Sequence, residues 1–189
     1  MFDGRMRRLY QTLYRLRVTP WDSAEIPAPV RAAAMAGSGR AVDLGCGTGR
    51  QARFLAQRGW DVTAVDFVAA AVESARRADV ERRVTWRVAD VTDVSTVDPD
   101  GRLAGAVDLI LDNGCLHGLD DRRGWVRTVE ALAGTRAVLL IRAAPRRRGP
   151  GIGPQGIDAG EVRALIGNGW AEAPTDPGWY LFTRSQRML

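Results

Sequence analysis

Residues 41–49 read AVDLGCGTG, a short apolar run with one aspartate that leads into three glycines at alternating positions. Glycine is needed where the backbone must turn sharply or let a ligand approach closely. A dinucleotide fingerprint has the spacing G-x-G-x-x-G, and counted from Gly45 its third glycine would fall on Arg50. The spacing here is G-x-G-x-G instead, and Asp43 would repel a pyrophosphate. The loop therefore predicts a site for a ligand that is cationic at this point.

Acids at the ends of two further predicted strands support this interpretation. Asp66 stands 21 residues after Gly45, where a carboxylate would accept both hydroxyls of a ribose. Asp90 follows the next strand, where it would take an adenine amino group while its apolar neighbours cover the ring. A lone aspartate more often caps a turn or a helix, but three acids in register with three strand ends make that explanation weak. S-adenosylmethionine carries an ammonium, a sulfonium and no phosphate, so it is the predicted cofactor.

On both sides of the glycine loop, apolar runs alternate with segments of helical periodicity. Predicted strands cover 41–44, 61–65, 84–88, 106–111, 136–141, 170–173 and 179–183, and predicted helices cover 51–58, 68–78, 122–133 and 158–166. Two more helices are expected before the first strand, over 1–16 and up to about residue 36. This alternation predicts right-handed βαβ crossovers and a mostly parallel sheet, with the ligand at the carboxyl ends of the strands.

The composition is that of an ordinary globular protein, with 189 residues of which 46% are hydrophobic and 26% charged. A chain of this length buries about 70% of its unfolded surface and needs no disulfide or metal to fold. Cys46 and Cys115 are too few for a disulfide framework and lack metal-ligand spacing, so no metal is predicted. No apolar run approaches the roughly 18 residues of a membrane span, and the N-terminus lacks the core of a signal peptide. We therefore expect a cytoplasmic protein without membrane contact.

The charge balance is unusual in one respect, because all 27 basic residues are arginine and no lysine occurs. Chemistry that requires a lysine, such as Schiff-base formation, is excluded. The net charge of +5 would suit nucleic acid or another anionic partner. Arginines spread over solvated faces are the simpler explanation.

The glycine loop, Asp66 and Ala89-Asp90-Val91 resemble the first three motifs of class I S-adenosylmethionine-dependent methyltransferases, and the similarity runs from about Gly37 to the C-terminus. The resemblance implies an α/β Rossmann-like fold with a seven-stranded sheet of order 3-2-1-4-5-7-6 and an antiparallel last strand. It also implies an N-terminal helical lid over residues 1–36 and a methyltransferase domain over 37–189. The cofactor-binding residues that it implies are Asp43, Gly45, Cys46, Gly47, Gly49, Asp66, Phe67, Asp90, Val91 and Asp112.

A narrower resemblance concerns the acceptor. Residues 19–22 (TPWD) and 112–117 (DNGCLH) are similar to elements of actinobacterial small-molecule methyltransferases of the thiopurine and benzoquinone type. The resemblance implies methyl transfer to O, S or N of a small acceptor, aromatic or from specialised metabolism. Tyr14, Trp21 and Asp22 are the predicted lid and substrate residues, although Tyr14 also suits a core position.

His117, the only histidine, and Asp112 are the predicted catalytic residues. The pKa class of histidine suits a general base for a hydroxyl or protonated-nitrogen acceptor, whereas a thiol or selenol needs little help. The alternative is that His117 braces its loop and that Asp112 fixes the following turn. Residues 146–148, three consecutive arginines, would hold an anionic acceptor group or belong to a solvated loop.

Two other functions stay open. A nucleic-acid (RNA) methyltransferase would suit the positive charge, but base-amino methyltransferases usually carry an Asn/Asp-Pro-Pro-aromatic element where this chain has DNGC at 112–115. Nucleic acid is therefore an unlikely partner and a small molecule the expected one. A protein that binds adenosylmethionine without transferring its methyl group is the other alternative. Both a monomer and a homodimer are compatible with the sequence.

Overall fold

The computed structural model describes residues 4–16, 18–20, 22, 25–147 and 154–184. Its strands are β1 (Arg40–Leu44), β2 (Asp61–Asp66), β3 (Val84–Val88), β4 (Val107–Asn113), β5 (Ala133–Arg142), β6 (Trp170–Ala173) and β7 (Trp179–Arg184). Its α-helices are α1 (Gly4–Arg15), α2 (Ala28–Ala36), α3 (Arg50–Ala56), α4 (Ala69–Ala78), α5 (Val94–Val97), α6 (Arg122–Leu132) and α7 (Ala159–Ile166).

The seven strands form one sheet in the order β3-β2-β1-β4-β5-β7-β6, as predicted. Strands β1 to β5 are parallel to one another, while β7 runs antiparallel to both β5 and β6. The strand order reverses between β1 and β4, so the crossovers leave a crevice above the carboxyl ends of these two strands. This is the α/β Rossmann-like architecture that the family resemblance implied.

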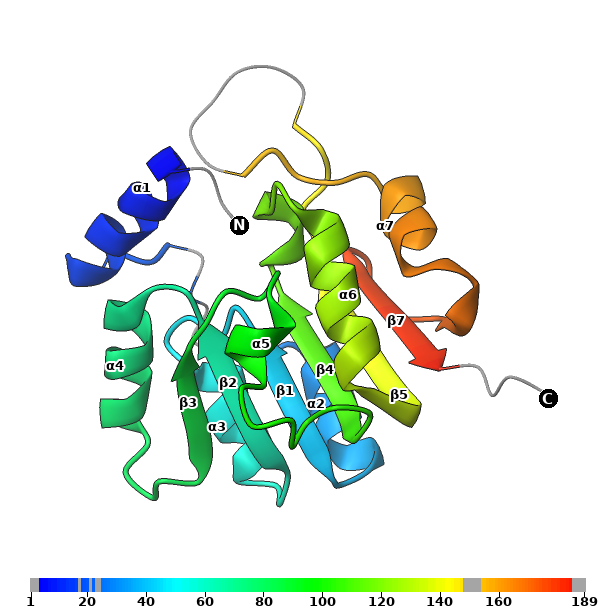
Figure 1. Ribbon diagram of the computed structural model, residues 1–189, viewed down its shortest axis with the longest axis horizontal. Coiled ribbons are helices and arrows are strands. Elements are labelled where there is room, and N and C mark those ends of the chain that lie inside the picture. The colour runs from blue at the N-terminus through cyan, green and yellow to red at the C-terminus, as the bar shows by residue number, and fades with distance from the viewer. Residues whose placement is uncertain (1–3, 17, 21, 23–24, 148–153, 185–189) are drawn as a thin grey trace.

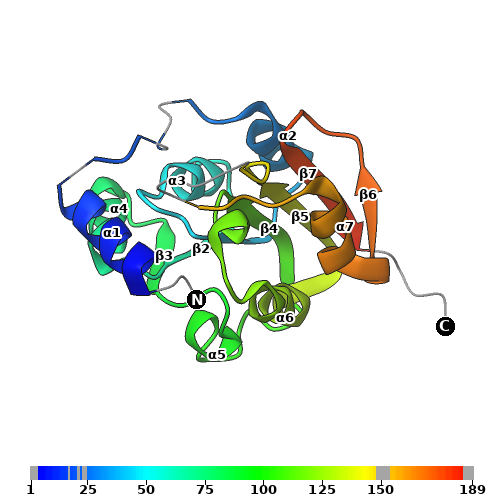
Figure 2. The ribbon, with the colours of Figure 1, turned by 90° about the horizontal axis from the view of Figure 1, so that it is seen from above.

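Helices cover both faces of the sheet (Figures 1 and 2). In the view of Figure 2, α2 and α3 lie on one side of the sheet, while α5 and α6 lie on the other. The buried side chains of α4 join those of α2 and α3 in one cluster, and those of α7 join the cluster of α5 and α6. Helix α1 packs against α4, beyond the edge of the sheet (Figure 1).

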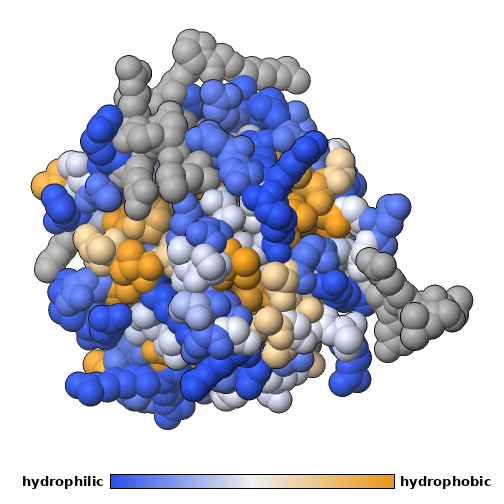
Figure 3. Space-filling view, viewed as in Figure 1, coloured by the Kyte–Doolittle hydropathy of each residue, from blue (hydrophilic) through white to orange (hydrophobic). Residues whose placement is uncertain are grey.

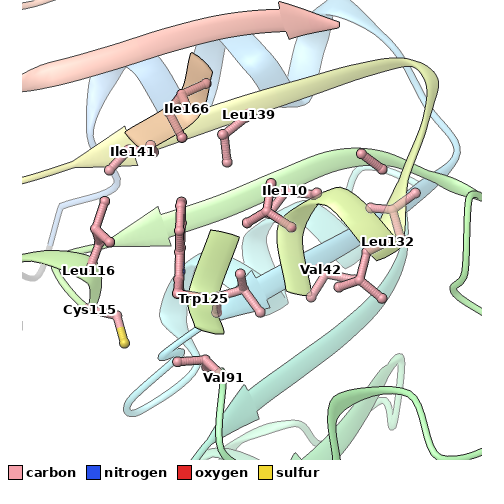
Figure 4. Close-up of a cluster of buried hydrophobic side chains, with 14 of the residues drawn as sticks. Val42, Val91, Ile110, Cys115, Leu116, Trp125, Leu132, Leu139, Ile141 and Ile166 are labelled. Atoms are coloured by element: carbon pink, nitrogen blue, oxygen red, sulfur yellow. The ribbon is translucent and has the colours of Figure 1, made fainter. Parts of the chain in front are cut away.

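The larger cluster of buried side chains lies between the sheet and α6 (Figure 4). Trp125 of α6 is completely buried there and stands between Ile110 of β4 and Leu116 of the loop after it. Leu116 is also inaccessible to solvent. The loop that follows β4 is therefore anchored by the core, which fixes the neighbouring polar residues at the mouth of the crevice.

Strand β5 and helix α5 differ from the sequence predictions. Strand β5 begins at Ala133, directly after α6, because Ala133 pairs with Val107 before a bulge in the β4–β5 ladder. The predicted strand starts only at Arg136, since the local sequence before it lacks apolar alternation. The short helix α5 was not predicted, and it begins where the Asp93 carboxylate accepts a hydrogen bond from the Ser95 amide at 3.0 Å.

The described surface is mixed in character. On the face that carries α4, α5 and α6, hydrophilic side chains predominate and hydrophobic ones form separate patches (Figure 3). Among the helices of the described ranges, none has the length and apolar character that crossing a bilayer requires.

Candidate active site

The glycine loop closes the carboxyl end of β1 and is tied to β2. Gly45 and Gly47 adopt φ values of 79° and 53°, a region that favours glycine. The amides of Gly45 and Cys46 both donate to the Val65 carbonyl at 2.9 Å. A Cβ on Gly45 would lie 2.6 Å from the Cβ of Cys115, and one on Gly47 would lie 2.7 Å from the Tyr14 hydroxyl. The loop therefore needs glycine both for its turns and for its close neighbours.

Gly49 has a packing role where α3 begins. Its φ is 73°, and a side chain there would collide with the ring of Trp86 and with Ala75. It does not line the cavity described below. The third glycine therefore allows this close packing, and its contact with the cofactor stays a prediction.

Asp43 is a buried acid with an unsatisfied oxygen. Its side chain lies at the end of β1, it is 1% exposed, and its Oδ2 has no hydrogen-bond partner among the described residues. Burial, followed by the charges of Asp112 and Asp66, raises its pKa from 3.8 to about 8. A buried polar atom without a partner is costly unless a ligand satisfies it. Because Asp43 lines the cavity, a cationic ligand there would both satisfy Oδ2 and favour its ionised form.

Asp66 ends β2 and holds the glycine loop in place. Its Oδ2 accepts from the Gly47 amide and its Oδ1 from the Val68 amide, each at 2.9 Å. Burial raises its pKa to about 6, although these two hydrogen bonds act in the opposite direction. Each carboxylate oxygen retains a second lone pair, so Asp66 can still accept hydrogen bonds from a ligand in the cavity. The next residue, Phe67, packs edge-on against Tyr10 of α1 with 6.3 Å between ring centres.

Asp90 and Val91 follow β3, where the sequence predicts contacts with the adenine. The Asp90 carboxylate accepts from the amide and the hydroxyl of Thr92, at 3.0 and 2.7 Å, and does not line the cavity. Val91 is buried and does line it. Asp90 thus shapes the turn that presents Val91, which is the local use of aspartate that the sequence pattern disfavoured.

Asp112 is likewise committed to its own backbone. It is fully buried at the end of β4, and its carboxylate accepts from the amides of Gly114, Cys115 and Leu116 at 2.8 to 3.2 Å. Burial raises its pKa to about 7, against the effect of those hydrogen bonds. It does not line the cavity. Of the roles considered for Asp112, these hydrogen bonds describe the one that fixes the turn, and its roles in catalysis and cofactor binding stay predictions.

A cavity of about 510 Å³ opens above these strand ends. Its β1–β2 half contains the glycine loop and the acids, namely Asp22, Asp43, Gly45, Cys46, Gly47, Thr48, Gln51, Asp66 and Phe67. Its β4–β5 half contains Asn113, Gly114, His117, Arg142, Ala143, Ala144, Pro145, Pro154, Pro177 and Gly178. Tyr10, Tyr14, Val91 and Cys115 complete the lining. The cavity is thus acidic in one half and cationic in the other.

The N-terminal segment covers the β1–β2 half. Tyr10 and Tyr14 of α1 reach the cavity, and Asp22 binds the glycine loop, where it accepts a hydrogen bond of 2.6 Å from the Thr48 hydroxyl. Asp22 also forms an ion pair with Arg50 at 3.7 Å. Trp21, the other predicted lid residue, lies outside the described residues. The structure therefore brings Tyr14 and Asp22 to the site.

His117 lies in the β4–β5 half, and its surroundings lower the pKa of its imidazole from 6.5 to about 4. Burial is the main cause, followed by the charges of Arg122 and Arg142. Its Nδ1 accepts a hydrogen bond from the Ala144 amide at 3.3 Å. Arg122 in turn donates to the carbonyls of His117, at 3.5 Å, and Gly156, at 2.9 Å. His117 therefore both faces the cavity and connects the loops after β4 and β5.

Sequence reasoning missed Asn113 and Arg142 as site residues. Asn113 ends β4, and its Oδ1 is buried without a partner among the described residues. Arg142 is paired with it in register at the end of β5. The signal was present, because both residues stand at the carboxyl ends of strands next to the switch point. The run of three arginines shortly after β5 is the more conspicuous basic feature of the sequence, so the single Arg142 was not singled out.

The predicted anion site at 146–148 is only partly described. Arg146 forms an ion pair of 3.0 Å with Asp158 and a second one with Glu161, so its charge is already compensated. The Arg147 amide donates to the Gln155 carbonyl at 2.9 Å. Arg148 lies outside the described residues. The cation that lines the cavity on this side is Arg142.

Cys46 and Cys115 are both buried free thiols. Burial and the neighbouring acids raise the pKa of each well above its ordinary value. A thiol in such surroundings is protonated and unreactive at neutral pH. Both line the cavity, where they act as small apolar groups beside the glycine loop.

Comparison with known proteins agrees with this geometry. A family model described as a methyltransferase domain matches residues 42–139, which is more than half of the chain. A curated relative is a 2-heptyl-1-hydroxyquinolin-4(1H)-one methyltransferase of Mycobacteroides abscessus, 26% identical over 144 residues. The match covers 74% of this chain and 62% of that relative.

Solved structures share the fold. One, from work on the conversion of a disulfide bond into a thioacetal group during echinomycin biosynthesis, has a TM-score of 0.75 at 21% identity and covers 96% of this chain and 94% of its own. Another, the 1,6-didemethyltoxoflavin-N1-methyltransferase of Burkholderia thailandensis, has a TM-score of 0.68 at 21% identity and covers 95% of this chain and 85% of its own. These likenesses concern the architecture of the sheet and its helices.

Proposed function

The chain belongs to the methyltransferase-domain family, and we propose that it transfers a methyl group from S-adenosylmethionine to a small-molecule acceptor. The observation that carries this proposal is Asp43, a buried carboxyl with an unpartnered oxygen beside a glycine loop. An ionised phosphate has no proton to donate to Asp43 and would be repelled by either carboxyl when it is ionised. An ammonium group donates to Asp43 and favours its ionised form.

The residues of the β1–β2 half fit this cofactor. Asp43 would accept a hydrogen bond from its ammonium group, and Asp66 has lone pairs left for the ribose hydroxyls. Phe67 and Val91 would provide apolar contacts for the adenine ring, and Gly47, which has no side chain, would let the cofactor approach the backbone of the loop. When bound, S-adenosylmethionine supplies an electrophilic methyl group on a sulfonium. The work of the chain is then to position the acceptor and to exclude water.

The lid assignment is part of this proposal. Tyr10 and Tyr14 of α1 reach the cavity, and the hydrogen bond between Thr48 and Asp22 fastens the segment after α1 to the glycine loop. We infer that residues 1–36 close over bound cofactor and that residues 37–189 form the methyltransferase domain. Closure of this kind removes water from the site.

A small acceptor suits the remaining space. The cavity holds about 510 Å³ in total, and the β4–β5 half is lined by prolines and alanines with a few polar groups. Pockets for small ligands have this composition of apolar walls and sparse polar anchors. The curated relative is named for a heteroaromatic acceptor, a hydroxyquinolinone, and an acceptor of this kind is the working hypothesis for this chain. Oxygen, nitrogen and sulfur are all retained as the atom methylated.

The cofactor assignment is tested by ligand-dependent stability. Adenosylhomocysteine at about 100 times its Kd should raise the free energy of unfolding by roughly 2.7 kcal/mol, because it binds only the folded chain. NADP and ATP at equal concentration serve as controls and should do far less. An unchanged Tm with adenosylhomocysteine, or a larger shift with NADP, would contradict the assignment.

Methyl transfer itself is tested by a screen of small acceptors that detects released adenosylhomocysteine. Phenols, N-hydroxy heteroaromatics, thiols and heteroaromatic nitrogens should all be included. Binding of adenosylhomocysteine without its production from any acceptor would favour a protein that binds the cofactor and does not transfer the methyl group.

A further inference from the structure

The hydrogen bond to Nδ1 decides which nitrogen of His117 carries a proton. The Ala144 amide donates to Nδ1, so Nδ1 must present a lone pair. In a neutral imidazole the proton then resides on Nε2. Nε2, the nitrogen that does not contact the Ala144 amide, is therefore a donor and cannot remove a proton from another molecule. This is the opposite of what a general base requires.

The charges around His117 keep it neutral. Arg122, from α6, approaches it from the protein side and is paired with Glu161 of α7. Arg142, from β5, lines the same cavity, and its charge also acts on the imidazole. Burial and these two guanidinium groups hold the pKa of His117 at about 4, so the imidazole has little tendency to take up a proton near neutral pH.

No other group in the described part of the β4–β5 half can serve as a base. Asn113 and Arg142 are its other polar side chains, and neither an amide nor a guanidinium accepts a proton near neutral pH. The carboxyls that line the cavity belong to the β1–β2 half, where Asp22 is engaged by Thr48 and Arg50. In the same half, Asp66 accepts from two backbone amides, and Asp43 is assigned above to the ammonium group of the cofactor. Donors and one positive charge thus face the acceptor.

The proton balance of methyl transfer then restricts the acceptor; this step rests on the proposed function. A lone pair of the acceptor atom forms the new bond to the methyl carbon, while the bond from sulfur to that carbon breaks and its electron pair stays on sulfur. An anionic acceptor ends neutral and no proton moves. A neutral hydroxyl would have to lose a proton, and the β4–β5 half offers no group to receive it.

We propose that His117 is a neutral hydrogen-bond donor through Nε2 and that, together with Arg142, it selects acceptors that enter the site already ionised. The class comprises acidic hydroxyl compounds, such as electron-poor phenols and N-hydroxy heteroaromatics. Alcohols and ordinary phenols, which need a base, are excluded. The two donors hold the acceptor by charge-assisted hydrogen bonds, which are stronger and more directional than those of neutral pairs.

The first experiment observes His117 directly in the full chain. Because the chain has one histidine, labelling with ¹⁵N-histidine gives NMR signals from a single imidazole. The proton should reside on Nε2, with Nδ1 unprotonated, from about pH 8 down to about pH 5. A proton on Nδ1, or titration near the ordinary value of 6.5, would overturn the proposal. This measurement needs neither cofactor nor acceptor.

The second experiment measures binding without turnover. The affinity of 4-nitrophenol, in the presence of adenosylhomocysteine, is followed across the pH range in which this probe ionises. The ionised form should bind roughly 10–100-fold more tightly than the neutral form, the range expected for hydrogen bonds to a charged group. Arg142→Gln should remove most of this preference. Equal affinity for the two forms, or no binding of the probe, would refute the selection of ionised acceptors.

Two substitutions of His117 separate the donor from a structural role. In His117→Gln the amide nitrogen can occupy the place of Nε2, whereas in His117→Asn it can occupy only that of Nδ1. We expect Gln to retain 4-nitrophenolate binding within about threefold and Asn to lose about tenfold. Equal losses would count against the donor. Failure of adenosylhomocysteine to bind the wild-type chain would instead contradict the proposed function, and the NMR result would still stand by itself.

Discussion

Asp43→Asn should stabilise the free protein while weakening its hold on the cofactor. The substitution keeps the shape of a side chain that is 1% exposed and removes its ability to ionise. The pKa of Asp43 is about 8 in the folded chain, against an ordinary value of 3.8, because of burial and then of Asp112 and Asp66. Between these two values the unfolded chain is ionised at this position and the folded chain keeps the proton. The unfolded state is therefore favoured increasingly as the pH rises from about 4 to about 8.

The size of the effect follows from these values. A pH of 7 lies about three units above the pKa of the carboxyl in the unfolded chain, which corresponds to about 4 kcal/mol of lost stability as an upper bound. The amide group that the substitution introduces needs hydrogen-bond partners of its own, and leaving it unsatisfied costs about 1–3 kcal/mol. The net gain expected at pH 7 is thus about 1–3 kcal/mol, or roughly 2–4 °C in Tm for each kcal/mol.

Cofactor binding should change in the opposite direction. Loss of a charged partner for an ammonium group weakens adenosylhomocysteine by about 1.5–3 kcal/mol, or roughly 10–100-fold in Kd. Urea unfolding between about pH 5 and 8 and calorimetric titration of adenosylhomocysteine measure the two quantities. The wild-type stability should fall with rising pH in this range, and the variant should show a flatter profile.

Asp61→Asn provides a matched control, because Asp61 starts β2 at the opposite end of the sheet and its side chain is 76% exposed. Its stability and its affinity for adenosylhomocysteine should both stay near the wild-type values, within about 0.5 kcal/mol. An Asp43→Asn protein that is less stable and binds adenosylhomocysteine normally would refute the reasoning, since Asp43 would then be a structural hydrogen-bond acceptor.

Three further predictions concern the glycine loop and the core beneath the site. Asp66→Ala should weaken adenosylhomocysteine by about 1–3 kcal/mol and also loosen the glycine loop, because it removes the acceptor of the Gly47 and Val68 amides; calorimetry and hydrogen exchange of those amides would report the two effects. Gly47→Ala should lower adenosylhomocysteine affinity while costing about 1 kcal/mol of stability, because its φ is 53° and the new Cβ meets the Tyr14 hydroxyl; a Kd equal to wild type would show that the lid does not need this contact. Trp125→Ala should destabilise the chain by about 3–5 kcal/mol in urea unfolding, because the ring is fully buried between α6 and β4, and a loss below about 1 kcal/mol would show that the core refills the space.

Much of the fold could be predicted because it rests on local patterns. The apolar runs that became β1, β2 and β4 are followed by glycine or end in aspartate and asparagine, and the helices α3 and α4 separate the first three strands. Handedness rules then leave few ways to arrange such units. The strand order itself came from the family resemblance, and the structure confirms it. The start of β5 at Ala133 was not predictable, since that residue becomes a strand through its pairing with Val107.

The candidate site was predictable to the extent that position along a strand indicates position in space. Asp43, Asp66 and the first two glycines meet at the cavity because parallel strands bring their carboxyl ends to one edge. Asp90 and Asp112 satisfy the same pattern and yet turn their carboxylates to their own backbone. A one-dimensional pattern cannot distinguish these cases, because an aspartate after a strand is equally suited to a ligand and to a turn.

The sequence by itself determined the sheet-forming segments, the glycine loop and the acidic character of the β1–β2 half, because each depends on residue type and spacing. Only the tertiary structure decided the β4–β5 half. It placed the Ala144 amide, 27 residues along the chain, on Nδ1 of His117, and it brought Arg142 to the same cavity, where its charge acts on the imidazole. A neutral histidine has one nitrogen that donates and one that accepts, so its role depends on which neighbour contacts Nδ1. That neighbour, Ala144, lies in the loop after β5, a strand that is adjacent to β4 in the sheet and remote from His117 in the sequence.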